Sequence, residues 1–486
     1  MLLALALPPA DLGPLALVAL APLLWSWRGA GPRDAALTGL TFGIVYFGIV
    51  YEWSRYFGLV AIVPLVLASS AYVVATGALV GACNRRGVRS PFLVAAIWVV
   101  FEGLRGRWPL GGLPWADAGL ALHDLGWGRA LATWGGVPLA SFVLVAVNGW
   151  LVELGLGIAA RARRRPGASR RIAVAGAVLG SVIVAVTVAA LFRPEPTVTG
   201  RVTFALLQAN DQNRDLTRRE EARDYLTNAH FALADGLTGR YDLIVFPESA
   251  LERDPERSGV LRNRIVELAA RHHANVLVNA RTEAPDHGLS NANLVYTPRG
   301  RLQGVYAKRH LVPFGEYVPF RRLLGRLGAL DRISFDYTPG HGRTMFRAGG
   351  HRFQTVICFE SAFAPLVRDA VRDGAELLVV STNNRSYRRS GLSAQHVALG
   401  QMRAAETGRP VLHAAISGIS AVIDADGTVR DRSELFVNRI TQGSIETTSG
   451  RTPYVRFGEW VLAACLLGLL VAAVVARRRG SRRTRP

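Results

Sequence analysis

The stretch ThrValIleCysPheGlu occupies residues 355–360 and joins a run of β-branched and apolar residues to a thiol and a carboxylate. Such a run is typical of a buried strand, and it predicts a strand with Cys358 at its end. Comparable runs lie at 202–208, 243–246, 275–280 and 377–381. Helical patterns lie at 217–236, 258–273 and 393–407, and AspAlaAspGly at 424–427 predicts the turn of a late hairpin. Residues 197–450 are therefore predicted to form one α/β layered domain.

Reactive side chains stand at three predicted strand ends of this domain. Glu248 lies in PheProGluSer, Lys308 opens LysArgHisLeuValProPheGlyGlu, which ends at Glu316, and Cys358 is followed two residues later by Glu360. A carboxylate can take the thiol proton, and an ammonium can lower the thiol pKa and stabilise an oxyanion. The backbone N–H of Phe359 could supply a second oxyanion donor. Brought together, these groups would form a nucleophilic site.

The lysine content is a separate observation. Of the 57 basic residues, 56 are arginine and only Lys308 is lysine. Drift of composition towards arginine explains the 56, and one surviving lysine can arise by chance. The alternative is that position 308 needs a compact ammonium, which the planar guanidinium fork cannot replace.

Apolar runs in the first half of the chain and near its end predict membrane spans. The sequence is 50% hydrophobic and only 19% charged, with a mean hydropathy of +0.21, which is too apolar for an ordinary soluble protein. Counting a short first run, eight lie at 2–8, 14–27, 36–52, 59–83, 91–104, 130–158, 172–192 and 460–476. The first is not interpreted as a signal peptide, because no charged segment precedes it and no small-residue cleavage site follows it.

The net charge of +21 would by itself favour nucleic acid as a partner. The arginines, however, cluster beside the apolar runs, at 28–33, 85–89, 161–171 and 477–485. Basic loops beside spans mark the cytoplasmic side of a membrane, which excludes the nucleic-acid reading and places both termini inside. The predicted organisation is a multi-span membrane domain (1–193), an extracytoplasmic catalytic domain (194–456), and a C-terminal transmembrane helix with a basic cytoplasmic tail (457–486).

The three reactive residues, in this order and context, match the glutamate, lysine and cysteine of the nitrilase (carbon–nitrogen hydrolase) superfamily. Combined with eight spans, the chain resembles bacterial apolipoprotein N-acyltransferases. The stretches that carry this resemblance are 14–24, 101–105, 113–115, 307–319, 395–396, 403–410 and 417–423. They cover nearly the whole chain.

The resemblance implies an αββα sandwich and a ping-pong acyl transfer in the cell membrane. Cys358 would take an acyl chain from a glycerophospholipid as a thioester and pass it to the amine of a diacylglyceryl-cysteine on an apolipoprotein. Glu248 would be the general base and Lys308 the charge stabiliser, with Glu316 and Glu360 matching supporting glutamates of the family. No metal or organic cofactor is implied.

Several features depart from the family pattern or allow other readings. The family's AsnAspAlaTrpPheGly is replaced by AsnAsnArgSerTyrArgArgSer at 383–390, which puts substrate binding in question. Glu102 and Arg105 are interpreted as an ion pair at the membrane edge, and Glu316 could instead pair with an arginine. The competing functions are a membrane-tethered nitrilase-type amidase for a small soluble substrate and an inactive membrane scaffold.

Overall fold

The computed structural model describes residues 1–210, 224–324 and 335–483, although not the side chains of 323–324 and 476–483. The chain divides into two compact units. Residues 1–194 and 456–486 form a helical unit, and residues 195–455 form an α/β unit. Part of the predicted helix 217–236 and the side chains of the predicted basic tail lie outside the described residues.

The helical unit has a helix at each of the eight apolar runs. Its helices are α1 (Leu2–Leu5), η1 (Gly13–Leu15), α2 (Ala16–Ala19), α3 (Ala21–Trp27), α4 (Pro32–Val50), η2 (Glu52–Phe57), α5 (Leu59–Arg85), α6 (Pro91–Arg105), η3 (Ala118–Leu122), α7 (Gly126–Ala162), α8 (Ala168–Leu191) and α15 (Trp460–Arg483). Within the described part of the chain, four helices are long and apolar enough to cross a membrane, namely α4, α5, α7 and α8.

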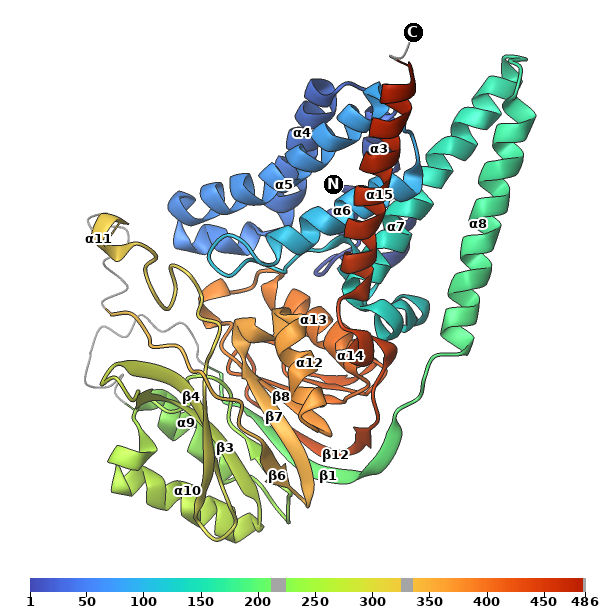
Figure 1. Cartoon of the computed structure of the whole chain (residues 1–486). Coiled ribbons are helices and arrows are strands. Elements are labelled where there is room, and N and C mark those ends of the chain that lie inside the picture. Colours follow the sequence, from blue (N-terminus) through green and yellow to red (C-terminus); the bar gives the residue numbers. More distant parts are fainter. Residues whose placement is uncertain (211–223, 325–334, 484–486) are drawn as a thin grey trace. The chain divides into compact units, whose positions relative to one another are not determined.

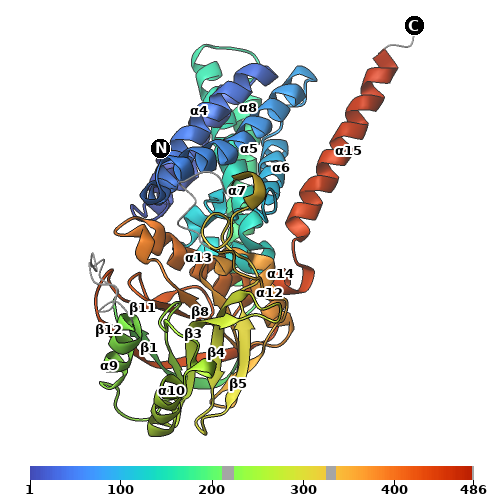
Figure 2. The ribbon, with the colours of Figure 1, turned by 90° about the vertical axis from the view of Figure 1, so that its left-hand side faces the viewer.

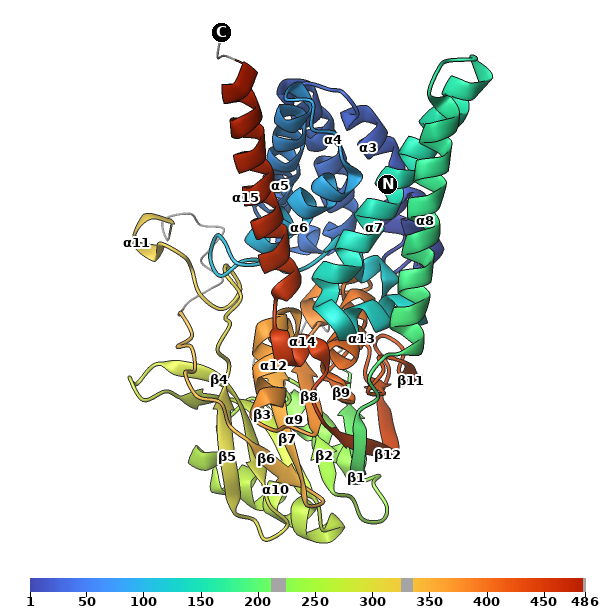
Figure 3. The same cartoon turned by 45° about the vertical axis from the view of Figure 1, so that its right-hand side comes forward.

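The run 14–27 is broken into three short helices, with Pro14 and Pro22 in their first turns. A second break divides α7, where Gly135 and Gly136 leave the helical conformation. The long helices pack pairwise, α4 beside α5 and α7 beside α8 (Figures 2 and 3). Although α15 is far from α6 in the sequence, the two helices pack together, with Val461 and Cys465 of α15 in one buried cluster with Val99 of α6.

Arg105 is buried within this unit and pairs with Asp117 at 2.6 Å rather than with Glu102. The Glu102 carboxylate instead accepts hydrogen bonds from the indole of Trp98 and the backbone N–H of Ala118. Arg105 also donates to the hydroxyl of Tyr51. The predicted Glu102–Arg105 pair is therefore wrong. The guanidinium of Arg105 is instead paired with the carboxylate of Asp117, in the loop after α6.

The α/β unit is built from two six-stranded sheets (Figure 1). The order in the first is β12-β1-β2-β3-β4-β5 and in the second β11-β10-β9-β8-β7-β6. The strands of the first sheet are β1 (Thr197–Gln208), β2 (Leu243–Val245), β3 (Asn275–Glu283), β4 (Leu289–Tyr296), β5 (Leu302–Ala307) and β12 (Arg439–Ser449). Those of the second are β6 (Phe346–Ala348), β7 (His351–Ile357), β8 (Leu377–Thr382), β9 (Val411–Ala415), β10 (Ala421–Ile423) and β11 (Val429–Arg432).

Helices cover the outer faces of both sheets. The helices of this unit are α9 (Tyr225–Ala234), η4 (Pro255–Arg257), α10 (Gly259–His272), α11 (Arg321–Leu324), η6 (Cys358–Ala362), α12 (Ala364–Arg372), η7 (Arg385–Tyr387), α13 (Leu392–Thr407) and α14 (Pro453–Phe457). Phe231 of α9 and Ile265 of α10 pack on the first sheet, whereas α13 contacts β9 and β10 of the second. The predicted strands and the predicted helices 258–273 and 393–407 are present, α9 lies within the described part of the predicted helix 217–236, and the turn at 424–427 joins β10 to β11 as predicted.

Both sheets contribute side chains to the hydrophobic core that lies between them. Phe204 and Leu277 from the first sheet meet Phe353 and Leu412 from the second, all at most 2% exposed. Burying each such side chain contributes about 1.5–3 kcal/mol. Cys358 packs partly against this same core. The two packed sheets therefore form a layered scaffold, and the reactive side chains follow the ends of its strands.

Candidate active site

The three predicted catalytic residues each follow a strand of the α/β unit. Glu248 lies three residues beyond the end of β2, Lys308 directly follows β5, and Cys358 directly follows β7. The predicted strand 355–359 ends earlier than expected, at Ile357, because the chain turns at Cys358. β2 and β5 belong to one sheet and β7 to the other, so the site forms where the two sheets face each other.

Lys308 is the centre of the site. Its side chain is only 1% exposed, and its Nζ lies 2.7 Å from Oε1 of Glu316 and 3.4 Å from Oε1 of Glu248. Burial by itself would lower the pKa of Lys308, but the two carboxylates outweigh burial and hold the pKa well above its usual range. The ammonium therefore stays charged, and Glu316 pairs with this lysine rather than with an arginine.

The loop that carries Lys308 is held by close backbone packing. The N–H of Gly340 donates to the carbonyl oxygen of Lys308 at 2.8 Å. A Cβ atom at position 340 would lie 2.3 Å from the carbonyl oxygen of Ala307, which is impossible without movement of that backbone. Glycine is thus required where the 335–345 segment meets the end of β5.

The carboxylate of Glu248 is oriented by neighbours that the sequence did not reveal. The amide of Asn291, on β4, donates to Oε1 of Glu248 at 2.7 Å and to Oε1 of Glu316 at 3.2 Å. The backbone N–H of Asn383 donates to Oε2 of Glu248 at 2.7 Å. Asn291 thereby bridges the two glutamates. It lies inside a strand and in no recognisable motif, so only the antiparallel register of β4 and β5 discloses it.

Cys358 occupies a sharp turn between strand and helix. Its φ is +52°, in the left-handed region that non-glycine residues rarely adopt. Burial, followed by the charge on Glu248, raises the pKa of Cys358 to about 12, although Lys308 and a hydrogen bond with Thr382 act in the opposite direction. The resting residue is therefore a thiol, and its ionisation requires a base within reach.

Glu360 connects the turn at Cys358 to the loop that carries Lys308. Its carboxylate is completely buried and accepts hydrogen bonds from the backbone N–H groups of Arg309 at 2.7 Å, His310 at 3.1 Å and Ile357 at 2.8 Å. The hydroxyl of Tyr306 donates to both of its oxygens at 3.0 Å. Because these donors flank Lys308 on one side and Cys358 on the other, Glu360 fixes the spacing between the two.

His396, on α13, forms a hydrogen bond with the backbone at the Cys358 turn. Its Nε2 lies 3.1 Å from the carbonyl oxygen of Cys358 and 2.8 Å from the hydroxyl of Ser361. Burial lowers the pKa of His396 to about 4, so the ring is neutral at neutral pH. Since a carbonyl oxygen only accepts, Nε2 carries the hydrogen and donates it to Cys358.

The segment 383–390, which departs from the family pattern, lies beside the site. Burial raises the pKa of Tyr387, and the charge of a Cys358 thiolate raises it further, which places this phenol within electrostatic reach of the nucleophile. Arg388 and Arg389 are exposed, and the Arg389 guanidinium lies 5.4 Å from the ring centre of Phe436. The ring of Phe359 packs edge-on against that of Phe363.

The α/β unit, which carries Glu248, Lys308 and Cys358, is similar to a known class of enzymes. Residues 205–447 match the family model described as "Carbon-nitrogen hydrolase". A solved carbon–nitrogen hydrolase superfamily protein from Xanthomonas campestris aligns with 55% of this chain and 96% of its own, at 22% identity and a TM-score of 0.39. The α/β unit is a nitrilase-like sandwich, as predicted.

Within the carbon–nitrogen hydrolase class, the sequence of the helical unit identifies one family. Residues 1–150 match the model described as "Apolipoprotein N-acyltransferase N-terminal domain". An apolipoprotein N-acyltransferase of Geobacter metallireducens is 31% identical over 502 residues, covering 99% of this chain and 94% of the relative. One from Methylococcus capsulatus is also 31% identical, over 99% of this chain and 95% of the relative. The chain belongs to the apolipoprotein N-acyltransferase family and is an acyltransferase of the nitrilase superfamily.

Proposed function

We propose that this protein transfers an acyl chain from a glycerophospholipid to the N-terminal amine of a diacylglyceryl-cysteine on apolipoproteins. The observation that carries the proposal is the buried Lys308 ammonium, held by Glu316 and Glu248 within electrostatic range of Cys358. Full-length similarity to proteins named apolipoprotein N-acyltransferase supports the acceptor. The phospholipid donor follows from the family resemblance and the helical unit.

In the first half-reaction, Sγ of Cys358 attacks the carbonyl carbon of the donor ester while Glu248 takes the thiol proton. The Lys308 ammonium, together with the N–H of Phe359, stabilises the negative oxygen of the tetrahedral intermediate. The C–O bond to the glycerol then breaks, and the leaving alkoxide receives the proton from Glu248. The products are a lysophospholipid and a thioester on Cys358.

In the second half-reaction, the free amine of the acceptor attacks the thioester carbonyl, and Glu248 accepts a proton from the nitrogen. The C–S bond breaks, an amide forms, and the proton returns to the sulfur. The raised pKa of Cys358 suits this cycle, because a neutral resting thiol is a poor nucleophile until a substrate and Glu248 are both in place.

We also propose that all eight helical runs embed in the membrane and that the α/β unit lies outside the cytoplasm. The arginine clusters support this orientation, since they lie in loops 28–35, 84–90 and 159–171. A reporter fused after residue 300 is expected to be active only outside, and one at the C-terminus only inside. The reverse pattern would contradict the orientation.

Mass spectrometry of a lipoprotein N-terminus tests the proposed reaction in cells. Cells with the protein are expected to carry a third, amide-linked acyl chain on the N-terminal cysteine, and cells that lack it or carry Cys358→Ala only two. Triacylated lipoproteins in the Cys358→Ala strain would exclude this chemistry. Diacylated lipoproteins in all three strains would leave amide hydrolysis as the better account.

A further inference from the structure

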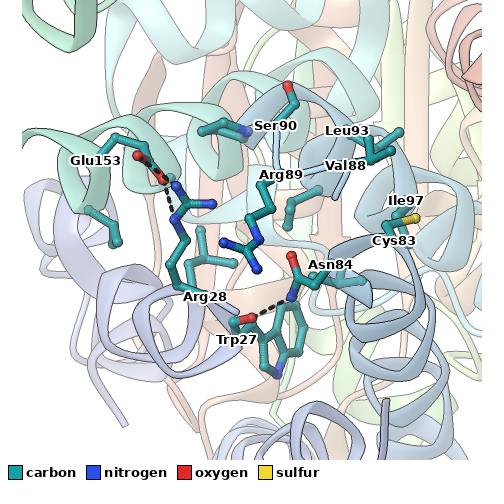
Figure 4. Close-up of a pocket in the computed structure, with 16 residues that line it drawn as sticks. Trp27, Arg28, Cys83, Asn84, Val88, Arg89, Ser90, Leu93, Ile97 and Glu153 are labelled. Atoms are coloured by element: carbon teal, nitrogen blue, oxygen red, sulfur yellow. Dashed lines mark hydrogen bonds and ion pairs between the residues drawn. The ribbon is translucent and has the colours of Figure 1, made fainter. Parts of the chain in front are cut away.

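A pocket in the helical unit contains charge that the acyl-transfer mechanism does not use (Figure 4). It is an open hollow between α3, the end of α5, the start of α6 and the middle of α7. Apolar side chains form most of its wall, among them Leu24, Val80, Leu93, Ile97 and Val152. Arg28, Arg89 and Glu153 are the ionised residues that line it.

The pocket has an excess of positive charge. Arg28 pairs with Glu153, Nε to Oε1, at 2.6 Å, and Arg171 donates to Oε2 of the same carboxylate at 2.7 Å. Figure 4 shows the Arg89 guanidinium pointing into the space between Arg28 and Asn84. Arg28 and Arg171 thus share one carboxylate, and Arg89 adds a third positive charge, which leaves an excess of two positive charges at and around the pocket.

Arg28 is held in place before any ligand arrives. Asn84 is buried, and its amide donates to the carbonyl oxygens of Trp27 at 2.8 Å and Ala30 at 3.2 Å, which fixes the turn that carries Arg28. Glu153, in turn, orients the Arg28 guanidinium. Such preorganisation lowers the entropic cost of binding a ligand.

We infer that this pocket binds an anionic phospholipid of the bilayer, with the headgroup phosphate on Arg28 and Arg89 and an acyl chain along the apolar wall. The guanidinium fork matches phosphate oxygens, and basic pockets between membrane helices favour anionic lipid headgroups. A zwitterionic headgroup fits less well, because Glu153, which already accepts from two arginines, is the only carboxylate that lines the pocket among the described residues.

The residues that line this pocket take no part in the proposed acyl transfer. Every residue that forms the pocket belongs to the helical unit, whereas Glu248, Lys308 and Cys358 belong to the α/β unit. The bound lipid would remain in the pocket as a ligand and would not be consumed. The inference can therefore fail while the proposed acyl transfer holds, and the reverse is also possible.

The test is a binding measurement on the purified, delipidated full chain carrying Cys358→Ala, so that no lipid is consumed. Native mass spectrometry would compare phosphatidylglycerol with phosphatidylethanolamine. The variant is Arg89→Gln, and the matched control is Arg86→Gln, an exposed arginine of the same loop that does not line the pocket.

We expect phosphatidylglycerol to bind more tightly than phosphatidylethanolamine, and Arg89→Gln to weaken it roughly tenfold, as the loss of one charged hydrogen bond predicts. Arg86→Gln should leave binding within about twofold, because Arg86 does not line the pocket. Equal binding of the two lipids, or equal effects of the two variants, would overturn the site. Inorganic phosphate that binds as tightly as the lipid would overturn the assignment to a bilayer ligand.

Discussion

Replacing Glu248 with glutamine tests the proposed proton transfer. Because burial and the charge on Glu248 raise the pKa of Cys358 to about 12, the residue is a thiol at pH 7, and its attack on an ester depends on a base. A positioned general base contributes about 10²–10⁴-fold to such a step. Glu248→Gln is therefore expected to slow acylation of Cys358 by at least about 100-fold.

The variant also changes hydrogen bonding in a defined way. Both oxygens of Glu248 accept from donors, Asn291 and Asn383, each at 2.7 Å. A glutamine amide must turn its NH₂ towards one of them, which costs about 1–3 kcal/mol of stability. Thermal unfolding would show whether the protein remains folded at the assay temperature.

The assay is single-turnover formation of the acyl-enzyme from a labelled phospholipid, quenched at intervals and measured by mass spectrometry. The matched control is Glu446→Gln, an exposed glutamate paired with Arg201 at 2.8 Å, whose loss should leave the rate within about twofold. A Glu248→Gln enzyme that is acylated within tenfold of the wild-type rate would refute the role of Glu248 as the base.

Four further predictions follow from the same geometry. Lys308→Arg should lose at least about 100-fold in acylation rate although the charge is kept, because the larger planar group cannot occupy a buried site between two carboxylates; a near-normal rate would show that charge alone suffices. Alkylation of Cys358 by iodoacetamide, followed on its own peptide, should accelerate about tenfold per pH unit from pH 7 to 10 without a plateau, since the pKa is raised to about 12 and the reactive thiolate grows as pH rises; a plateau near pH 8 would contradict this. Glu360→Gln should lower the free energy of unfolding by about 2 kcal/mol or more, measured by denaturant titration, because it weakens bonds to Arg309, His310 and Ile357; an unchanged midpoint would argue against the bracing role. Gly340→Ala should slow acylation by displacing the Lys308 loop, whereas Gly342→Ala, where a Cβ meets open space, should not; equal rates for the two variants would count against the close packing.

The position of much of the candidate site could be predicted from sequence because its residues lie at strand ends. A buried apolar run followed at once by a reactive residue places that residue at the edge of a sheet, which holds for Cys358 after β7 and Lys308 after β5. Position 308 also holds the only lysine of the sequence. The family motifs then joined these residues across the 110 positions that separate Glu248 from Cys358.

The supporting groups could not be predicted, because long-range pairing brings them to the site. Asn291 reaches the two glutamates only through the register of β4 with β5, and the backbone N–H of Asn383 leaves no trace in side-chain patterns. The pairing of β1 with β12 joins segments more than 200 residues apart. Likewise, the Arg105–Asp117 pair depends on the path of the loop after α6, which periodicity does not encode.

The apolar runs show that hydropathy does not predict where a helix ends or breaks. Each apolar run contains helical residues, but composition does not fix helix length where proline interrupts the run, as at Pro14 and Pro22. The glycine pair at 135–136 divides α7 although the apolar pattern continues through it. An apolar run therefore locates a helix better than it defines the ends of that helix.

The most direct test of the account is to find where a phospholipid acyl chain becomes attached. The purified full chain would be incubated with a labelled phospholipid without acceptor, and its peptides would be analysed by mass spectrometry before and after neutral hydroxylamine. We predict one acyl adduct on the peptide containing Cys358, released by hydroxylamine and missing from Cys358→Ala. An adduct on any other residue, or one that persists in Cys358→Ala, would contradict the claim that this thiol is the nucleophile.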